Sequence, residues 1–173
     1  KTFSALGCYG MSVITALTAQ NTEGIQGIQE VDPKFIEKQI NSTLEDIGVD
    51  VIKIGMLFNS SVIKTIARCL REIKNCPIVL DPVMFAKSGD RLLQEDAVES
   101  IKNELFPLAT IITPNIPEAE ALLDYSIESS ESMQQAAIDL NKLVPKAVVV
   151  KGGALSARTS DDCFVIEGRN PQW

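Results

Sequence analysis

The sequence predicts an α/β fold in which an open, mainly parallel β-sheet carries helices on both faces. Short apolar runs, such as Ile78–Leu80, are typical of strands buried in a parallel sheet. These runs alternate with amphipathic helical patterns at close to the roughly 30-residue spacing of a βαβ unit. A closed eight-stranded barrel needs about 250 residues, whereas the chain has 173. With no linker or change of composition, residues 1–173 are predicted to form a single domain.

Composition and charge exclude several classes of function. Hydrophobic residues make up 45% of the chain, which argues against disorder. The 16 basic and 23 acidic residues give a net charge of −7, and there is no basic run. Neither nucleic acid nor an anionic membrane is therefore expected as a partner. No apolar stretch reaches transmembrane length, and the first residues show no signal-peptide pattern.

Cysteine and histidine usage narrows the chemistry further. The four cysteines form no CxxC pair, so we expect reduced thiols in a cytoplasmic protein rather than zinc ligands. The absence of histidine excludes a Ser-His-Asp triad.

The first third of the chain contains one well-defined helix signal. Asp32 is a predicted N-cap, Pro33 takes the first helical position, and Gly48 ends the helix. The elements expected before it are a helix end at residues 1–6, a strand at 8–17, a polar loop at 18–22 and an edge strand at 25–31.

Strands and helices alternate beyond Gly48. Asn59 or Ser60 caps one predicted helix, and Ser129 or Ser130 caps another. The other elements expected are strands at 51–54, 77–81, 109–113 and 147–150, helices at 94–106 and 115–123, and an antiparallel edge strand at 163–166.

Polar residues follow three of the predicted strands. Asp81 comes directly after Ile78–Leu80, Asn115 follows the strand at 109–113, and Lys151 follows the strand at 147–150. In an open parallel sheet, ligands bind beyond the carboxyl ends of the strands, which share one rim. Carboxylate and amide oxygens suit Mg²⁺, and a lysine beside glycine amides suits phosphate. The sequence therefore favours a phosphate and metal site at this rim.

Each of these residues also has an ordinary structural explanation. Asp81 followed by proline is a common turn. Asn115 with Glu118 three residues later fits a capping box at a helix start. Lys151 fits a solvated strand end, and the glycine pair after it fits a turn. No single residue decides between the structural and the functional interpretation. The convergence of these residues on one rim is what favours the site.

Five segments of the chain resemble a known family. They are KTFSALGCYGMSVITALTAQNT, VIKIGM, LDPVM followed by AKSGDRLL, ITPNIPEAEAL and VVVKGG. Together they are similar to the hydroxymethylpyrimidine/phosphomethylpyrimidine kinases of thiamine biosynthesis, which are ribokinase-like proteins close to the pyridoxal kinases. The resemblance is colinear and covers almost the whole chain. LDPVM with AKSGDRLL is its most specific part.

The resemblance implies an activity and the groups that bind the substrate. The implied reaction is ATP-dependent phosphorylation of 4-amino-5-hydroxymethyl-2-methylpyrimidine and its monophosphate, with ATP and Mg²⁺, in a cytoplasmic homodimer. Gln20 matches the glutamine that hydrogen-bonds the pyrimidine, and Met56 and Val83 match apolar residues around its ring. Gln20 with Met56 favours a pyrimidine over pyridoxal. A pyridoxal-type kinase and a non-catalytic pyrimidine-binding homologue stay open as alternatives.

On the phosphate side, the resemblance places four residues. Asp81 matches an aspartate near the phosphates and Mg²⁺, and Lys151 matches a lysine beside the nucleotide. Asn115 and Glu118 match an NxxE motif that acts through Mg²⁺ and its waters. Asp81 and Glu118 are thus the expected metal-site residues, with water between them and the ion.

Two family features are not found in this sequence. One is an N-terminal strand and glycine-rich loop followed by a substrate-binding aspartate. The other is a Gly-Thr-Gly-Cys motif at a helix N-terminus, which forms the anion hole. We therefore assign no catalytic residue in this chain, and Cys163 does not take the place of the motif's cysteine. The chain is expected to be the central part of such a kinase or a degenerate relative.

Overall fold

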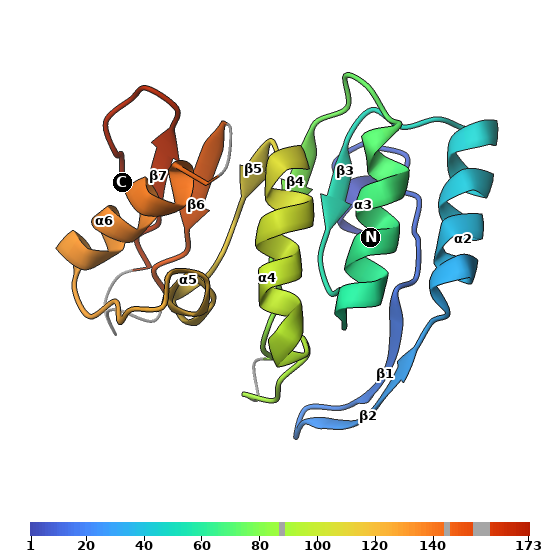
Figure 1. Cartoon of the computed structure of the whole chain (residues 1–173), viewed down its shortest axis with the longest axis horizontal. Helices are drawn as coiled ribbons and strands as arrows, with labels where there is room; N and C mark the ends of the chain where they lie inside the picture. The colour runs from blue at the N-terminus through green and yellow to red at the C-terminus, as the bar shows by residue number, and fades with distance from the viewer. Residues whose placement is uncertain (87–88, 144–145, 154–159) are drawn as a thin grey trace.

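A computed structural model describes residues 1–86, 89–143, 146–153 and 160–173 (Figure 1). Residues 87–88 of the predicted loop after Asp81 lie outside the described residues. The elements in chain order are α1 (Thr2–Ala5), β1 (Ala16–Gln20), β2 (Ile25–Glu30), α2 (Pro33–Asp46), β3 (Ile52–Ile54), α3 (Ser60–Arg71), β4 (Ile78–Leu80), a 3₁₀ turn (Glu95–Ala97), α4 (Val98–Ser100), a π-helical stretch (Ile101–Leu105), a second 3₁₀ turn (Phe106–Leu108), β5 (Ile111–Ile112), α5 (Ile116–Leu123), α6 (Ser130–Asn141), β6 (Ala147–Val150) and β7 (Cys163–Ile166).

The main sheet has five strands in the order β3-β4-β5-β6-β7. The first four are parallel, and β7 pairs antiparallel with β6. Leu80 pairs with Ile54 on one side and Ile112 on the other, and Val148 continues the row. The predicted mainly parallel sheet, with an antiparallel strand at its edge, is confirmed.

The helices α3, α4 and α6 lie on the same face of this sheet, in front of the strands in Figure 1. The strand order follows the sequence order, so right-handed crossovers place every connecting helix on the same side. Leu80, Ile112 and Val148 on the covered face are fully buried. On the opposite face Val79 is half-buried and Lys53 is exposed. The helices that connect the parallel strands therefore cover one face of the sheet.

The helices α2 and α3 begin at the capping residues that the sequence predicts. The Asp32 carboxylate accepts hydrogen bonds from the backbone N–H groups of Lys34 and Phe35 at the start of α2. The Asn59 side chain accepts one from Val62 at the start of α3. None of the described helices is both long and apolar enough to cross a membrane.

The predicted helix at 94–106 is less regular than expected. It passes from a 3₁₀ turn through α4 into the π-helical stretch Ile101–Leu105. Pro107 follows this stretch, and proline lacks an N–H and its ring crowds the carbonyl four residues earlier. A widened turn ahead of Pro107 relieves that clash.

The β1–β2 hairpin differs from the prediction of a strand at 8–17 and a loop at 18–22. The two strands pair antiparallel from Ala16 to Gln20, so the strand begins and ends later than expected. Ile14, just before it, exchanges its backbone hydrogen bonds with the Gln39 side chain at 2.9 and 3.0 Å. The hairpin extends downward in Figure 1, at the same edge as the loop before α4.

Candidate functional site

The residues one to three positions after the parallel strands lie along one edge of the sheet, which we call the strand-end rim (Met56, Asp81, Asn115 and Lys151). The Asp81 N–H donates to a carbonyl of β3 at 2.9 Å, so this residue continues the β3–β4 pairing. Lys151 donates to the carbonyl of Pro114 at 2.9 Å and forms a parallel bridge with Asn115. Asp81, Asn115 and Lys151 are therefore brought together as the sequence predicted.

Asp81 is the centre of an ion-pair cluster on this rim. Lys151 Nζ lies 2.9 Å from Asp81 Oδ1, although β5 separates their two strands. Lys53 Nζ lies 3.3 Å from Asp81 Oδ2. The Asp81 side chain is 21% exposed, and its burial disfavours the charged form. Hydrogen bonding and charge from Lys151 and Lys53 outweigh that burial and hold the Asp81 pKa below its ordinary value.

Lys53 is a member of this ion-pair cluster that was not predicted from the sequence. It occupies the middle of β3, between Ile52 and Ile54. A lysine inside an otherwise apolar strand must point away from the covered face, because alternate residues face opposite sides. That alternation could have shown that Lys53 leaves the covered face, but its contact with Asp81 follows only from the pairing of β3 with β4.

Glu118 is 2% exposed and forms the predicted capping box with Asn115. Its Oε2 accepts the Asn115 N–H at 2.8 Å, and its Oε1 accepts the Met84 N–H at 3.4 Å. Burial raises the Glu118 pKa, and the two amides and the Lys151 charge only partly offset it. The cap is thus real, but a cap does not require a carboxylate buried this deeply beside a second carboxylate and a lysine.

The residues assigned to the substrate side are spread over three segments. Gln20 is exposed at the last position of β1, opposite Ile25 of β2. Val83 is half-buried two residues after Asp81. Met56 is half-buried and lines a cavity of about 330 Å³ between β3, α2, α3 and the segment before β1.

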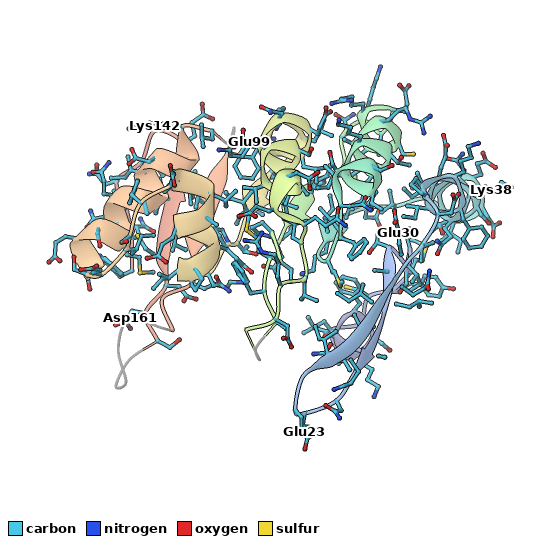
Figure 2. All side chains as sticks on the ribbon, turned by 60° about the horizontal axis from the view of Figure 1, so that its bottom comes forward. Glu23, Glu30, Lys38, Glu99, Lys142 and Asp161 are labelled. Carbon is cyan, nitrogen blue, oxygen red and sulfur yellow. The ribbon has the colours of Figure 1, made fainter. Side chains whose placement is uncertain are left out.

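A hydrogen bond ties the hairpin to the loop that follows Asp81. The Ile25 N–H donates to the Asp90 carboxylate at 3.2 Å. Figure 2 turns the lower edge of Figure 1 forward, with Glu23 at the hairpin tip and Asp161 at the other end of that edge. The hairpin end therefore contacts the loop that follows the rim residue Asp81.

The glycine pair after Lys151 is held by the segment that precedes β7. The Gly152 N–H donates to the Asp162 carboxylate at 3.0 Å. A Cβ on Gly152 would stand 2.0 Å from the Asp161 carbonyl oxygen, so only glycine fits. Packing thus accounts for Gly152, and its amide has a protein partner.

The carboxylates suit a magnesium ion that keeps most of its water. In the part of the chain that the structure describes, no three histidine, cysteine or acidic side chains gather into a metal cluster. Both oxygens of Asp81 face lysines, and both oxygens of Glu118 accept backbone N–H groups. Each oxygen can accept a further bond from a metal-bound water. Mg²⁺ commonly binds in this way, through one or two carboxylates, waters and substrate phosphates.

Cys163 lies in β7 and is fully buried. Burial raises the pKa of its thiol, so the group stays protonated and a poor nucleophile. This position supports leaving Cys163 out of the site.

The chain matches known proteins along its whole length. The family model described as phosphomethylpyrimidine kinase covers residues 1–173. A thiamine biosynthesis bifunctional protein of Geobacter sulfurreducens is 49% identical over 94% of the chain and 33% of its own length. The hydroxymethylpyrimidine/phosphomethylpyrimidine kinase of Escherichia coli is 44% identical over 97% of the chain and 64% of its own length. The chain therefore spans between one third and two thirds of these relatives.

Two solved structures share the fold of this chain. A phosphomethylpyrimidine kinase from Clostridium difficile superposes with a TM-score of 0.87 at 43% identity, covering 97% of this chain and 72% of that one. A Staphylococcus aureus pyridoxal kinase in complex with AMP-PCP and pyridoxal gives a TM-score of 0.82 at 30% identity, covering 95% and 59%. The predicted ribokinase-like α/β fold is thereby confirmed.

Proposed function

This chain belongs to the phosphomethylpyrimidine kinase family, and from that premise we propose that the complete protein phosphorylates hydroxymethylpyrimidine and its monophosphate. The donor is ATP, and the reaction serves thiamine biosynthesis. The observation that carries the proposal is the cluster of Asp81, Lys151 and buried Glu118 on the strand-end rim. These are the groups that phosphoryl transfer needs, because its catalysis is mostly positioning and electrostatic stabilisation.

Lys151 is the proposed contact for the nucleotide phosphates. Its side chain is 39% exposed, so its ammonium group can reach a ligand while its backbone stays fixed at the end of β6. Asp81 holds this ammonium at 2.9 Å and thereby orients it before the nucleotide binds. Preorganised charge of this kind is usually a large part of the rate enhancement.

Asp81 and Glu118 are the proposed metal-site residues, acting through water. When bound, Mg²⁺ neutralises charge on the phosphate oxygens. Glu118 keeps its position because α5 and the backbone of Met84 both hold its carboxylate. Asn115 supports this arrangement, since its side chain accepts the Glu118 N–H at 2.9 Å.

Gln20, Met56 and Val83 are the proposed substrate contacts. The Gln20 amide has one donor face and one acceptor face, which complement the ring nitrogen and amino group of the pyrimidine. Met56 on the rim and Val83, two residues after Asp81, are half-buried apolar side chains that can cover the faces of the ring.

We also propose that the protein acts in the cytoplasm as a homodimer. The four cysteines are all free thiols, the state that the reducing cytoplasm maintains. Leu6, Tyr9 and Leu17 are large apolar side chains exposed near the N-terminus and on the hairpin, which gives a second copy an apolar surface. Light scattering on the complete protein should give twice the subunit mass, and a monomer mass would contradict the dimer.

The test of the function is a coupled ADP-release assay on the complete protein. Hydroxymethylpyrimidine, its monophosphate and pyridoxal are compared as acceptors. We expect turnover of both pyrimidines, with kcat/KM above that for pyridoxal. A preference for pyridoxal would move the protein to the pyridoxal kinases, and no turnover with any acceptor would contradict the kinase assignment.

A further inference from the structure

The hydrogen bond between Asp90 and the hairpin joins segments that are 65 residues apart in the chain. Asp90 lies in the loop that starts at the rim residue Asp81. Its partner, Ile25, is the first residue of β2 and pairs with Gln20 of β1. The contact therefore connects the phosphate side of the proposed site to the residue that is proposed to read the pyrimidine.

The hairpin turn is shaped to receive this carboxylate. A Cβ on Gly24 would lie 3.2 Å from Asp90 Oδ2, and Gly24 has a φ of +156° that other residues rarely adopt. The Asn21 side-chain oxygen accepts the N–H groups of Glu23 and Gly24 at 2.9 and 3.2 Å. These bonds organise the turn and leave the Ile25 N–H directed at Asp90.

The loop that carries Asp90 is itself anchored to the rim. The Ala86 N–H donates to the Asp90 carbonyl at 2.8 Å. The Leu92 N–H donates to the Met84 carbonyl at 2.8 Å, and the Met84 N–H donates to Glu118. A continuous set of hydrogen bonds therefore runs from buried Glu118 to the loop that presents Asp90.

We infer that Asp90 is a positioning residue for the pyrimidine site, which rests on the function proposed above. Its carboxylate fixes the end of the β1–β2 hairpin, and so fixes Gln20 relative to the strand-end rim. The hairpin needs such an anchor because a two-stranded antiparallel ribbon is marginally stable alone. Asp90 does not touch the substrate in this account and acts only through the hairpin.

The test compares Asp90→Ala, Asp90→Asn and the control Asp96→Ala in the complete kinase. Asp96 is an exposed aspartate six residues further along the chain. Losing a charged hydrogen-bond acceptor in Asp90→Ala should raise KM for hydroxymethylpyrimidine about five- to tenfold, with KM for ATP unchanged. Asp90→Asn keeps an oxygen that accepts the Ile25 N–H and should restore most of the loss. Asp96→Ala should match wild type.

Hydrogen exchange supplies a readout that does not depend on activity. The Ile25 amide should exchange faster in Asp90→Ala than in wild type and at a near-normal rate in Asp90→Asn. Unchanged exchange in Asp90→Ala, or faster exchange with an unchanged pyrimidine KM, would overturn the inference. Failure of the proposed function would look different, because wild type itself would then not phosphorylate the pyrimidine.

Discussion

The strand-end rim and the β1–β2 hairpin contribute to the proposed site by different structural means. On the rim, Asp81, Asn115 and Lys151 each continue a strand of the same parallel sheet, and backbone hydrogen bonds between neighbouring strands hold them. On the hairpin, Gln20 is exposed, and the ribbon that carries it meets the rest of the molecule through individual side chains. Geometry on the rim is therefore set by the whole sheet, whereas geometry on the hairpin depends on a few contacts.

This difference separates the expected effects of substitutions. Rim residues should control phosphoryl transfer and nucleotide binding, because they hold charge next to the sheet ends. Hairpin residues should control pyrimidine recognition and leave the nucleotide unaffected. Substitutions on the rim and on the hairpin test that separation.

Lys151→Met should lower kcat about 10²- to 10³-fold, as expected for loss of one preorganised charge at the transferring phosphate. Lys53→Met is the matched control, because Lys53 also contacts Asp81 but is more exposed, at 49%. Steady-state kinetics of both variants measure whether the loss of kcat is specific to Lys151. Equal losses in the two would mean that the lysines act only by balancing the charge of Asp81.

Gln20→Leu should lower kcat/KM for hydroxymethylpyrimidine, because polar groups of the ring are left unpaired. The expected loss corresponds to about 1–3 kcal/mol of transition-state stabilisation. The nucleotide KM should not change. Gln29→Leu makes the same change on the partner strand of the hairpin, where Gln29 pairs with Leu17. If both substitutions weaken the pyrimidine reaction equally, the effect belongs to the hairpin and not to Gln20.

Glu118→Gln should reduce turnover about tenfold, equivalent to about 1.4 kcal/mol in the barrier. Glutamine serves as well as glutamate in a capping box, so the thermal midpoint should fall by no more than about 2–4 °C. Glu120→Gln is the control on the same helix, since Glu120 also accepts a backbone N–H, from Ile127 at 2.7 Å. Normal turnover of Glu118→Gln at saturating Mg²⁺ would leave Glu118 with a structural role only.

The two rim carboxylates should respond to pH in opposite ways. The Glu118 pKa is raised above 4.5, so its contribution to stability is present below pH 4.5 and is lost as pH rises through the raised value. The Asp81 pKa is lowered below 3.8, so its contribution is present above pH 3.8 and is lost only in acid. Denaturant unfolding between about pH 4.5 and pH 7 measures both.

In that window, the stability of wild type relative to Glu118→Gln should fall as pH rises. Its stability relative to Asp81→Asn should stay level, because Asp81 is ionised throughout. A level result for Glu118→Gln would show that its carboxylate is not perturbed in the folded protein.

Much of the rim could be predicted because its signals are local. Ile78–Leu80 followed by Asp81, and the cap at Asn115, each lie within a few consecutive residues, and parallel pairing then brings them to one edge. The contact of Lys53 with Asp81 could not be predicted in the same way. It depends on which strands are neighbours, and the sequence pattern does not state the strand order.

The hairpin was predicted less well for a related reason. The run of apolar and β-branched residues at 8–17 indicated a strand. A strand forms only where a partner strand can pair with it, and β2 pairs only with Ala16 to Gln20. The bond from Ile25 to Asp90 spans 65 residues and has no local signature. The helices that connect β3 to β6 share one face for a topological reason as well, since their side depends on the order of these strands.

The most direct test of the division between rim and hairpin is crossed binding calorimetry on the complete protein. Wild type, Gln20→Leu and Lys151→Met are each titrated with hydroxymethylpyrimidine and with a non-hydrolysable ATP analogue in the presence of Mg²⁺. We predict that Gln20→Leu weakens only the pyrimidine and Lys151→Met weakens only the nucleotide. Loss of both affinities in either variant, or the reverse pairing of losses, would contradict the account.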